Sequence, residues 1–140
     1  MDVVNGKAAA AGFDASALEI VEGSSAEIEI YDNAGNGTGI FISIVSSESE
    51  EVLALKRKLM DRRLARMRRQ GGRAVLSSVE IEAEAMDVRV ACTKGWRGMF
   101  WHGEELKCTP DNLRMIYTKA PTIRSQVDDG VSDATLFTKG

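Results

Sequence analysis

The sequence predicts an α+β fold, in which an N-terminal β-hairpin or small antiparallel sheet precedes about four helices. Residues 26–31 alternate between apolar and polar side chains, which is typical of a half-buried strand. The turn-rich segment DNAGNGTG, residues 32–39, separates them from a branched and aromatic run at residues 40–45. Residues 50–70 then consist of strong helix formers and stop at a double glycine.

Length and composition indicate one globular domain. The chain has 140 residues, of which 44% are hydrophobic and 28% are charged, as in ordinary soluble proteins. No apolar run approaches the roughly 18 residues that a membrane span requires. The first residues lack the basic start and apolar core of a secretory signal, so we expect an intracellular protein. Cys92 and Cys108 form no CxxC pair, which favours free thiols.

The predicted organisation has three parts. Residues 1–17 are rich in alanine and small polar side chains and are expected to be flexible. Residues 18–128 form the α+β domain, with a hairpin region at 18–46 and a helical region at 47–128. Residues 129–140 are expected to hold a short helical turn and a frayed C-terminus.

In the hairpin, the alternation turns Ala26, Ile28 and Ile30 toward the interior. Residues 18–21 are a candidate third strand. The glycines of residues 32–39 also suggest a phosphate-binding loop, but such loops open a helix. Here a second strand follows and no lysine stands in the right place, which favours a hairpin turn.

A long basic helix is predicted from Ser47 to the double glycine at residues 71–72. Ser47 and Glu50 have the spacing of a capping box, and acidic residues at the start with arginines at the end suit the helix dipole. Core packing is favoured over partner contacts for its methionines. The apolar residues occupy two adjoining faces, one with Val52, Leu55 and Leu59 and the other with Leu53, Met60, Leu64 and Met67.

A second helix is predicted from Val75 to Lys94, with Ser77 or Ser78 near its start. Its outer side is acidic. The double glycine before it permits an antiparallel helix pair with the acidic helix beside the basic one. Its apolar face consists of Val75, Val79, Met86 and Val90, and its acidic side consists of Glu80, Glu82, Glu84 and Asp87.

The rare residues gather between Cys92 and Val127, where both tryptophans, both prolines and the only histidine lie. Three glycines interrupt the aromatic residues of its first part, which predicts an irregular connector clamped between helices. The connector contains Gly95, Trp96, Gly98, Phe100, Trp101 and Gly103.

Two short helices are predicted after this connector. Thr109 is a good N-cap with Pro110 at the first helical position, and Leu113, Ile116 and Tyr117 follow at helical spacing. Pro121 ends this helix and opens the next, whose Ile123 and Val127 share one face.

Charge is segregated along the chain. Residues 1–51 carry ten acidic side chains and one basic one, whereas residues 52–73 carry nine basic side chains and one acidic one. Three interpretations of the basic helix remain open: a solvated face that pairs with acidic segments, a docking surface for an acidic protein, or a nucleic-acid footprint. A pI near 5.3 and the absence of aromatics among the arginines disfavour nucleic acid.

Catalytic and metal-binding patterns are weak. His102 is the only histidine, and no serine stands in a nucleophile motif such as GxSxG. The spacing of Cys92, His102 and Cys108 matches no familiar zinc site. We therefore expect no catalytic residues, no metal and no cofactor.

The order of these features resembles the tail assembly chaperones of long-tailed bacteriophages and prophages. The similarity covers residues 90–128 and, more loosely, the basic helix. Its pieces are ACTKGW, a G-W-x-G turn, Gly103-Glu104 followed by Leu106, the helix opening TPDN and the closing segment PTIRSQV. The chain departs from the family at Thr122 and Ser125, where aromatic and acidic residues are common. The motif positions are Gly95, Trp96, Gly98, Pro110, Asn112, Pro121, Ile123 and Gln126.

The resemblance implies a non-enzymatic protein of the host bacterial cytoplasm that is absent from the mature virion. Such chaperones bind the tape measure protein, keep it soluble and help recruit the major tail tube protein. Trp101 is the favoured exposed aromatic, whereas Trp96 suits a small core equally well. The candidate partner-binding residues are Trp96, Phe100, Trp101, Arg62, Arg66 and Arg69.

Two other functions stay open. A basic-helix nucleic-acid-binding protein would bind duplex or RNA with a steep salt dependence. A structural tail or neck subunit would remain in the virion. A homo-oligomer is compatible with the sequence, and no membrane partner is expected.

Overall fold

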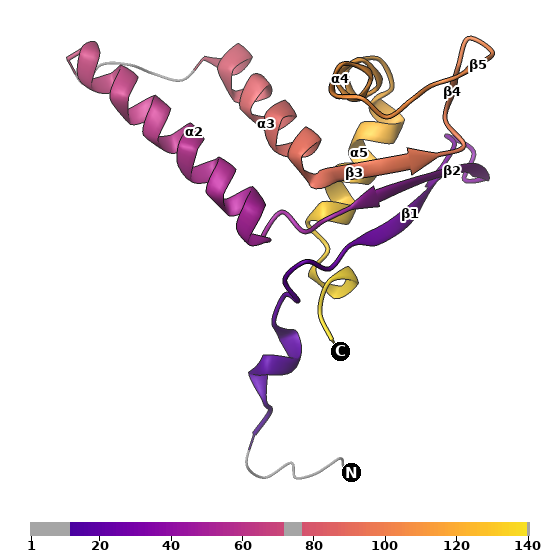
Figure 1. Cartoon of the computed structure of the whole chain (residues 1–140), viewed down its shortest axis with the longest axis horizontal. Helices are drawn as coiled ribbons and strands as arrows, with labels where there is room; N and C mark the ends of the chain where they lie inside the picture. The colour runs from indigo at the N-terminus through magenta and orange to yellow at the C-terminus, as the bar shows by residue number, and fades with distance from the viewer. Residues whose placement is uncertain (1–11, 72–76, 140) are drawn as a thin grey trace.

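The structure, a computed structural model, describes residues 12–71 and 77–139 (Figure 1). Within these ranges it has four α-helices and two antiparallel sheets, of three and two strands, so the predicted α+β class is confirmed. The elements in order are η2 (Ala15–Leu18), β1 (Ala26–Tyr31), β2 (Gly37–Ile44), α2 (Glu50–Arg69), α3 (Ser78–Cys92), β3 (Thr93–Arg97), β4 (Phe100–Trp101), β5 (Glu104–Glu105), α4 (Pro110–Lys119), α5 (Pro121–Val131) and η3 (Ala134–Leu136).

The N-terminal β-hairpin is confirmed. β1 and β2 pair antiparallel, with Ala26 opposite Ile44 and Ile28 opposite Ile42. Ile30 is buried, and Ala26 and Ile28 pack against the core, as the alternation predicts. β2 begins at Gly37, so only residues 32–36 form the turn.

The structure corrects the prediction of an irregular connector, because its first residues form the strand β3. Residues 93–97 form no irregular loop but pair antiparallel with β2, with Gly95 opposite Ser43 and Trp96 opposite Ile42. The predicted helix therefore ends at Cys92 rather than Lys94, and strands occur inside the region expected to be helical. The reversal that the glycines predicted comes later, between β3 and the short β4–β5 ribbon.

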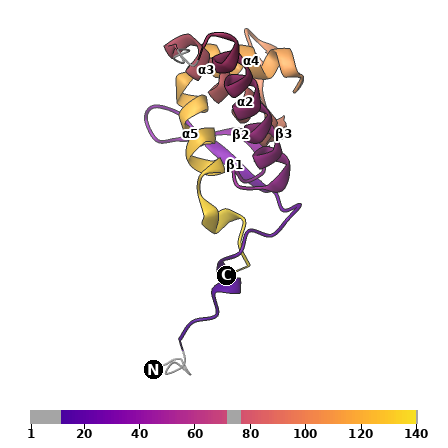
Figure 2. The same ribbon diagram turned by 90° about the vertical axis from the view of Figure 1, so that its left-hand side faces the viewer.

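One face of the three-stranded sheet is covered by helices. Figure 2 shows α5 lying along one side of β1 and β2. The approach is close at Gly130, where an added Cβ would lie 2.9 Å from Ile44 Cδ1 and 3.3 Å from Ile28 Cδ1. The core between the layers includes Ile42, Ile44, Val52, Cys92, Met99, Leu113, Ile116, Tyr117 and Val127.

The opposite face of the sheet carries polar and aromatic side chains. Arg97 stacks over the ring of Phe41 at 4.0 Å and forms an ion pair with Glu27 at 2.9 Å. This ion pair lowers the pKa of Glu27. The three residues come from three neighbouring strands, so the contact ties this face together.

α2 and α3 form the predicted antiparallel pair, which projects away from the sheet (Figure 1). Val52 and Leu59 are buried, which confirms the inner face of α2. The chain leaves α2 through Gly71, whose φ is 67°. Val75, the predicted start of the second helix, lies outside the described residues. In the structure, α3 begins at Ser78.

The two chain ends correct two further predictions. Residues 18–21 are not a third strand, because η2 occupies Ala15–Leu18 and only Ile20 pairs, in an isolated bridge with Thr138. Residues 129–140, expected to hold a short helical turn and a frayed end, include members of the core. α5 continues to Val131, and Phe137 is 1% exposed. The expected short helical turn is present as η3.

Candidate functional site

The predicted basic residues lie on α2 but differ in their availability. Arg66 forms an ion pair with Glu80 of α3, and Arg63 forms one with Glu84. Arg62 lines a groove between the two helices, and Arg69 is exposed at the end of α2. Arg66 therefore holds the helix pair together, which makes Arg62 and Arg69 the more accessible of the three predicted residues.

Other basic side chains of α2 have no acidic partner among the residues that the structure describes. No carboxylate within residues 12–71 and 77–139 forms a salt bridge with Arg57, Lys58, Arg62, Arg68 or Arg69. Lys56, in contrast, lies 3.6 Å from Glu48 and donates to the Ser47 carbonyl. The outer side of α2 thus keeps positive charge that the neighbouring acidic helix does not neutralise.

The predicted aromatic residues occupy β3 and β4. Trp96 is half-buried, and its indole Nε1 donates to the Leu106 carbonyl at 2.8 Å. Trp101 also packs against the core, so its predicted exposure is wrong. Phe100, its neighbour in a two-residue strand, points the other way and is 60% exposed. Phe100 is therefore the accessible aromatic side chain among the three predicted ones.

The family-motif residues mostly have structural roles. Trp96 joins β3 to the segment after β5. Pro110 opens α4, whose N-cap Thr109 accepts a hydrogen bond from the Asn112 N–H at 3.2 Å. The Asn112 side chain donates to the Lys107 carbonyl at 2.8 Å and so fixes the preceding loop.

The closing part of the motif fastens α5 to the sheet. Pro121 is the first residue of α5, and Ile123 packs against the core. The Gln126 side chain accepts from the Tyr31 N–H at 2.9 Å and donates to the Tyr31 carbonyl at 2.8 Å. This pair of hydrogen bonds satisfies the edge of β1 where the hairpin turn begins.

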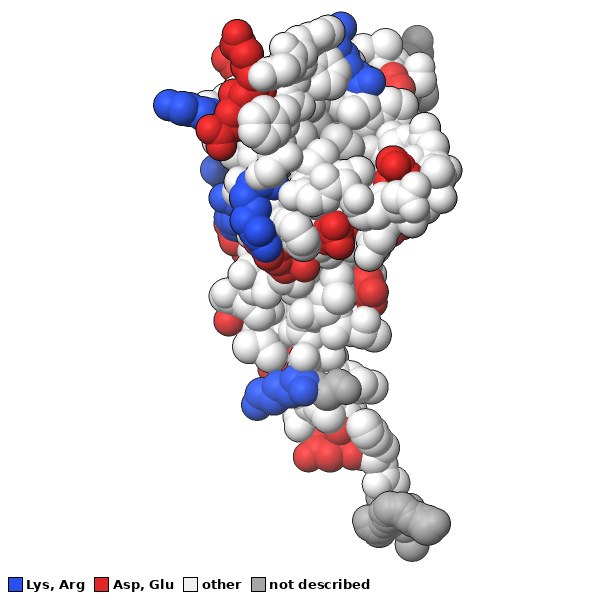
Figure 3. Space-filling view, turned by 90° about the vertical axis from the view of Figure 1, so that its right-hand side faces the viewer, with Lys and Arg blue, Asp and Glu red and all other residues white. Residues whose placement is uncertain are grey.

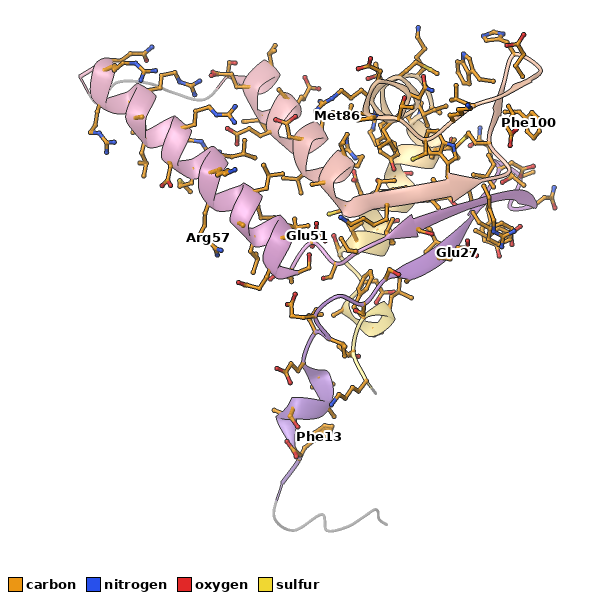
Figure 4. All side chains as sticks on the ribbon, in the orientation of Figure 1. Phe13, Glu27, Glu51, Arg57, Met86 and Phe100 are labelled. Atoms are coloured by element: carbon orange, nitrogen blue, oxygen red, sulfur yellow. The ribbon has the colours of Figure 1, made fainter. Side chains whose placement is uncertain are left out.

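The structure does not bring the two predicted contact groups together. Phe100 lies at the start of the β4–β5 ribbon, whereas Arg57 lies on the outer side of α2 at the opposite end of the molecule (Figure 4). Around β4 and β5, charged side chains of both signs occur in small separate groups (Figure 3). The basic surface and the aromatic surface are therefore distinct candidates.

Sequence reasoning missed a group of exposed apolar side chains on the helix pair. Met60 is 47% exposed and Leu64 is 42% exposed on α2, and Ile81 is 53% exposed on α3. The expectation that Met60 packs in the core is therefore wrong. The two faces of α2 were visible in the sequence, but its packing against α3 decides which of them is covered.

A cavity of about 410 Å³ lies between α3, α4 and α5. Both arginines on its lining are engaged. Arg89 donates to both carboxylate oxygens of Asp128, at 2.7 and 2.9 Å, and Arg124 donates to the Tyr117 carbonyl at 2.8 Å. These contacts join the three helices around the cavity.

Burial raises the pKa values of three titratable side chains in and around the core. It raises the pKa of the Cys92 thiol to about 11 and that of the Tyr117 hydroxyl to about 12. It also raises the pKa of Cys108. A thiol with a raised pKa is a poor nucleophile, because the thiolate is the reactive form.

The described residues contain no cluster of three or more side chains suited to hold a metal ion. None of the helices that the structure describes is both long and apolar enough to cross a membrane. Comparison of the chain with protein families, with curated proteins and with solved structures finds no match.

Proposed function

We propose that this protein is a non-enzymatic tail assembly chaperone of a long-tailed bacteriophage or prophage. In this role it binds the tape measure protein in the host cytoplasm, keeps it soluble and helps recruit the major tail tube protein. The observation that carries the proposal is the ordered block of motifs from Gly95 to Val127, which resembles this family in content and order.

The accessible surface suits a holdase for an elongated client. The α2–α3 pair projects from the body and exposes Met60, Leu64 and Ile81 beside arginines that have no described acidic partner. Apolar side chains provide contact area to an aggregation-prone chain, and the charges orient it. Phe100 provides a second, separate contact at the other end.

Co-expression with the tape measure protein encoded nearby tests the proposal. The expected result is a soluble complex that co-purifies with this protein, under conditions in which the tape measure protein alone precipitates. Size analysis then gives the stoichiometry. Mass spectrometry of purified virions is expected to lack this protein. Its presence there at stoichiometric levels would instead identify a structural tail or neck subunit.

The basic side chains of α2 that have no described acidic partner keep nucleic acid as a second candidate. If the tape measure protein stays insoluble and this protein elutes alone, the chaperone proposal fails. A salt titration with duplex DNA and RNA then decides. Binding that weakens steeply with salt and on changing Arg62 and Arg69 to alanine would support the alternative.

A further inference from the structure

One side of the helix pair carries an apolar strip on α2, with Arg57 at its outer edge in the two-turn gap between Leu53 and Met60. Leu53, Met60, Leu64 and Met67 are separated by seven, four and three residues, which places them on one face of a helix. Leu53 and Met67 are half-buried, whereas Met60 and Leu64 are exposed, at 47% and 42%. From Leu53 to Met67 the strip is about 21 Å long, at about 1.5 Å per residue.

α3 extends the strip on the same side. The ion pairs Arg63–Glu84 and Arg66–Glu80 fix the antiparallel register. They place Met67 beside the turn of α3 that contains Ile81, and Met60 beside the turn that contains Val88.

The side on which Ile81 and Val88 lie follows from the groove on the opposite flank. That groove is lined by Arg62 of α2 together with Ala83 and Asp87 of α3. Ile81 and Val88 lie on the other flank of α3, about 100–160° around the helix from Ala83 and Asp87 at 3.6 residues per turn, and so share a side with Met60. We call this surface the apolar face of the helix pair. It consists of the exposed Met60, Leu64 and Ile81 and the half-buried Leu53, Met67 and Val88, of which Val88 also packs against the core.

Positive charge borders the apolar face. Arg57 lies three residues before Met60, and Arg68 lies four residues after Leu64, so both are direct neighbours of the strip. Neither forms a salt bridge with a carboxylate among the described residues. In Figure 4, Arg57 projects from α2 on the side away from α3. A partner that covers the strip therefore meets cations at its outer border.

We propose that the apolar face of the helix pair binds one amphipathic α-helix whose apolar stripe is bordered by acidic residues. The strip is straight and about four turns long, which matches a helix laid along it. Glutamate or aspartate beside that stripe would pair with Arg57 and Arg68. The inference rests on the proposed function, because it assigns this chemistry to the client segment that the chaperone holds.

A second copy of this chain is a poor occupant of the face. A twofold pairing would place the same surface of both copies together, and Arg57 and Arg68 of one copy would face those of the other. Like charges facing each other across an interface oppose association. The occupant is therefore a partner of opposite charge.

A synthetic peptide of about 18 residues tests the proposal with the full-length protein. The labelled probe carries leucines at helical spacing bordered by glutamates. Two controls have the same leucines bordered by lysines, or the same composition in scrambled order. Fluorescence anisotropy is expected to show binding of the glutamate peptide at least about tenfold tighter than either control. Raising the salt concentration weakens this binding.

Matched variants locate the contact. Leu64→Glu on the apolar face is expected to weaken peptide binding at least about tenfold. Val79→Glu introduces the same charge at a residue of α3 that is 72% exposed but lies off the face, and is expected to leave binding unchanged. Circular dichroism checks that both variants fold. Equal effects of the two variants, or equal binding of the scrambled peptide, would overturn the proposal.

Two further outcomes are decisive. If sedimentation shows a wild-type dimer that Leu64→Glu dissociates, a second copy occupies the face and the proposed occupant is wrong. If the tape measure complex forms equally well with Leu64→Glu and the wild type, the proposed function stands but this surface does not serve it. Peptide binding without any tape measure complex would preserve the surface and refute the function.

Discussion

At the scale of single residues, two glycines of the same motif have different roles. Gly98 turns the chain from β3 toward β4 with a φ of 76°, in the left-handed region that favours glycine. A Cβ at this position would also overlap the carbonyl oxygen of Gly39 in the β1–β2 hairpin. Gly95 has an ordinary φ, and a Cβ there would meet nothing within 4 Å. Of these two glycines, only Gly98 requires the absence of a side chain.

Gly98→Ala is expected to lower the free energy of unfolding by about 2 kcal/mol or more, because backbone strain and the overlap with Gly39 add together. Gly95→Ala is the matched control and is expected to change it by less than about 0.5 kcal/mol. Urea denaturation followed by tryptophan fluorescence measures both. Comparable losses in the two variants would contradict the assignment of the turn to Gly98.

At the scale of elements, the start of each long helix shows how tertiary contacts select among local signals. Ser47–Glu50 and Ser77–Glu80 have the same capping-box spacing. Ser77 forms the box with Glu80, through hydrogen bonds of 3.0 and 3.2 Å. Ser47 does not, because its N–H donates to the Val131 carbonyl at 2.9 Å, and α2 begins after Ser49 instead. The predicted capping box at Ser47 is therefore wrong.

Ser77→Ala is expected to destabilise the protein by about 1 kcal/mol, the typical value for removing a helix N-cap side chain. Ser47→Ala is the control and is expected to have an effect within about 0.5 kcal/mol, because the Ser47 hydroxyl forms no hydrogen bond with the described residues. Thermal unfolding followed by circular dichroism distinguishes the two. A larger loss for Ser47→Ala would mean that the sequence pattern, not the observed geometry, identifies the cap.

Local patterns predicted the elements whose signals are local. Alternation predicted β1, and Pro110 and Pro121 predicted the starts of α4 and α5. β3 was missed because its pairing partner, β2, lies about fifty residues earlier, and Gly95 suggested a turn.

For the candidate site too, the sequence predicted the local features and missed those that depend on contacts between elements. The basic character of α2 follows from its composition, but which arginines are paired depends on the register with α3. The error at Trp101 has the same origin, since the core behind β4 decides that Trp101 packs inward while Phe100 stays exposed.

At the scale of the whole molecule, the core draws on residues from nearly the full length of the described chain. Ile30, Val52, Cys92, Tyr117 and Phe137 belong to one buried cluster. The C-terminal segment is fastened by the Val21 N–H, which donates to the Phe137 carbonyl at 2.9 Å, and by the bridge between Ile20 and Thr138. The end of the chain thus closes the core beneath the sheet (Figure 1).

Phe137→Ala is accordingly expected to destabilise the whole fold by about 3–5 kcal/mol, because it removes a large buried ring and leaves a cavity. This is a large share of the about 5–15 kcal/mol that stabilises a typical domain. Leu136→Ala alters the neighbouring residue, which is 39% exposed, and is expected to cost less than about 1 kcal/mol.

Urea unfolding is followed by tryptophan fluorescence, which reports the sheet, and by circular dichroism, which reports the helices. Both midpoints are expected to fall together in Phe137→Ala, because the ring contacts a core shared by all the elements. Equal stability of the two variants would show that the C-terminal segment is not part of that core.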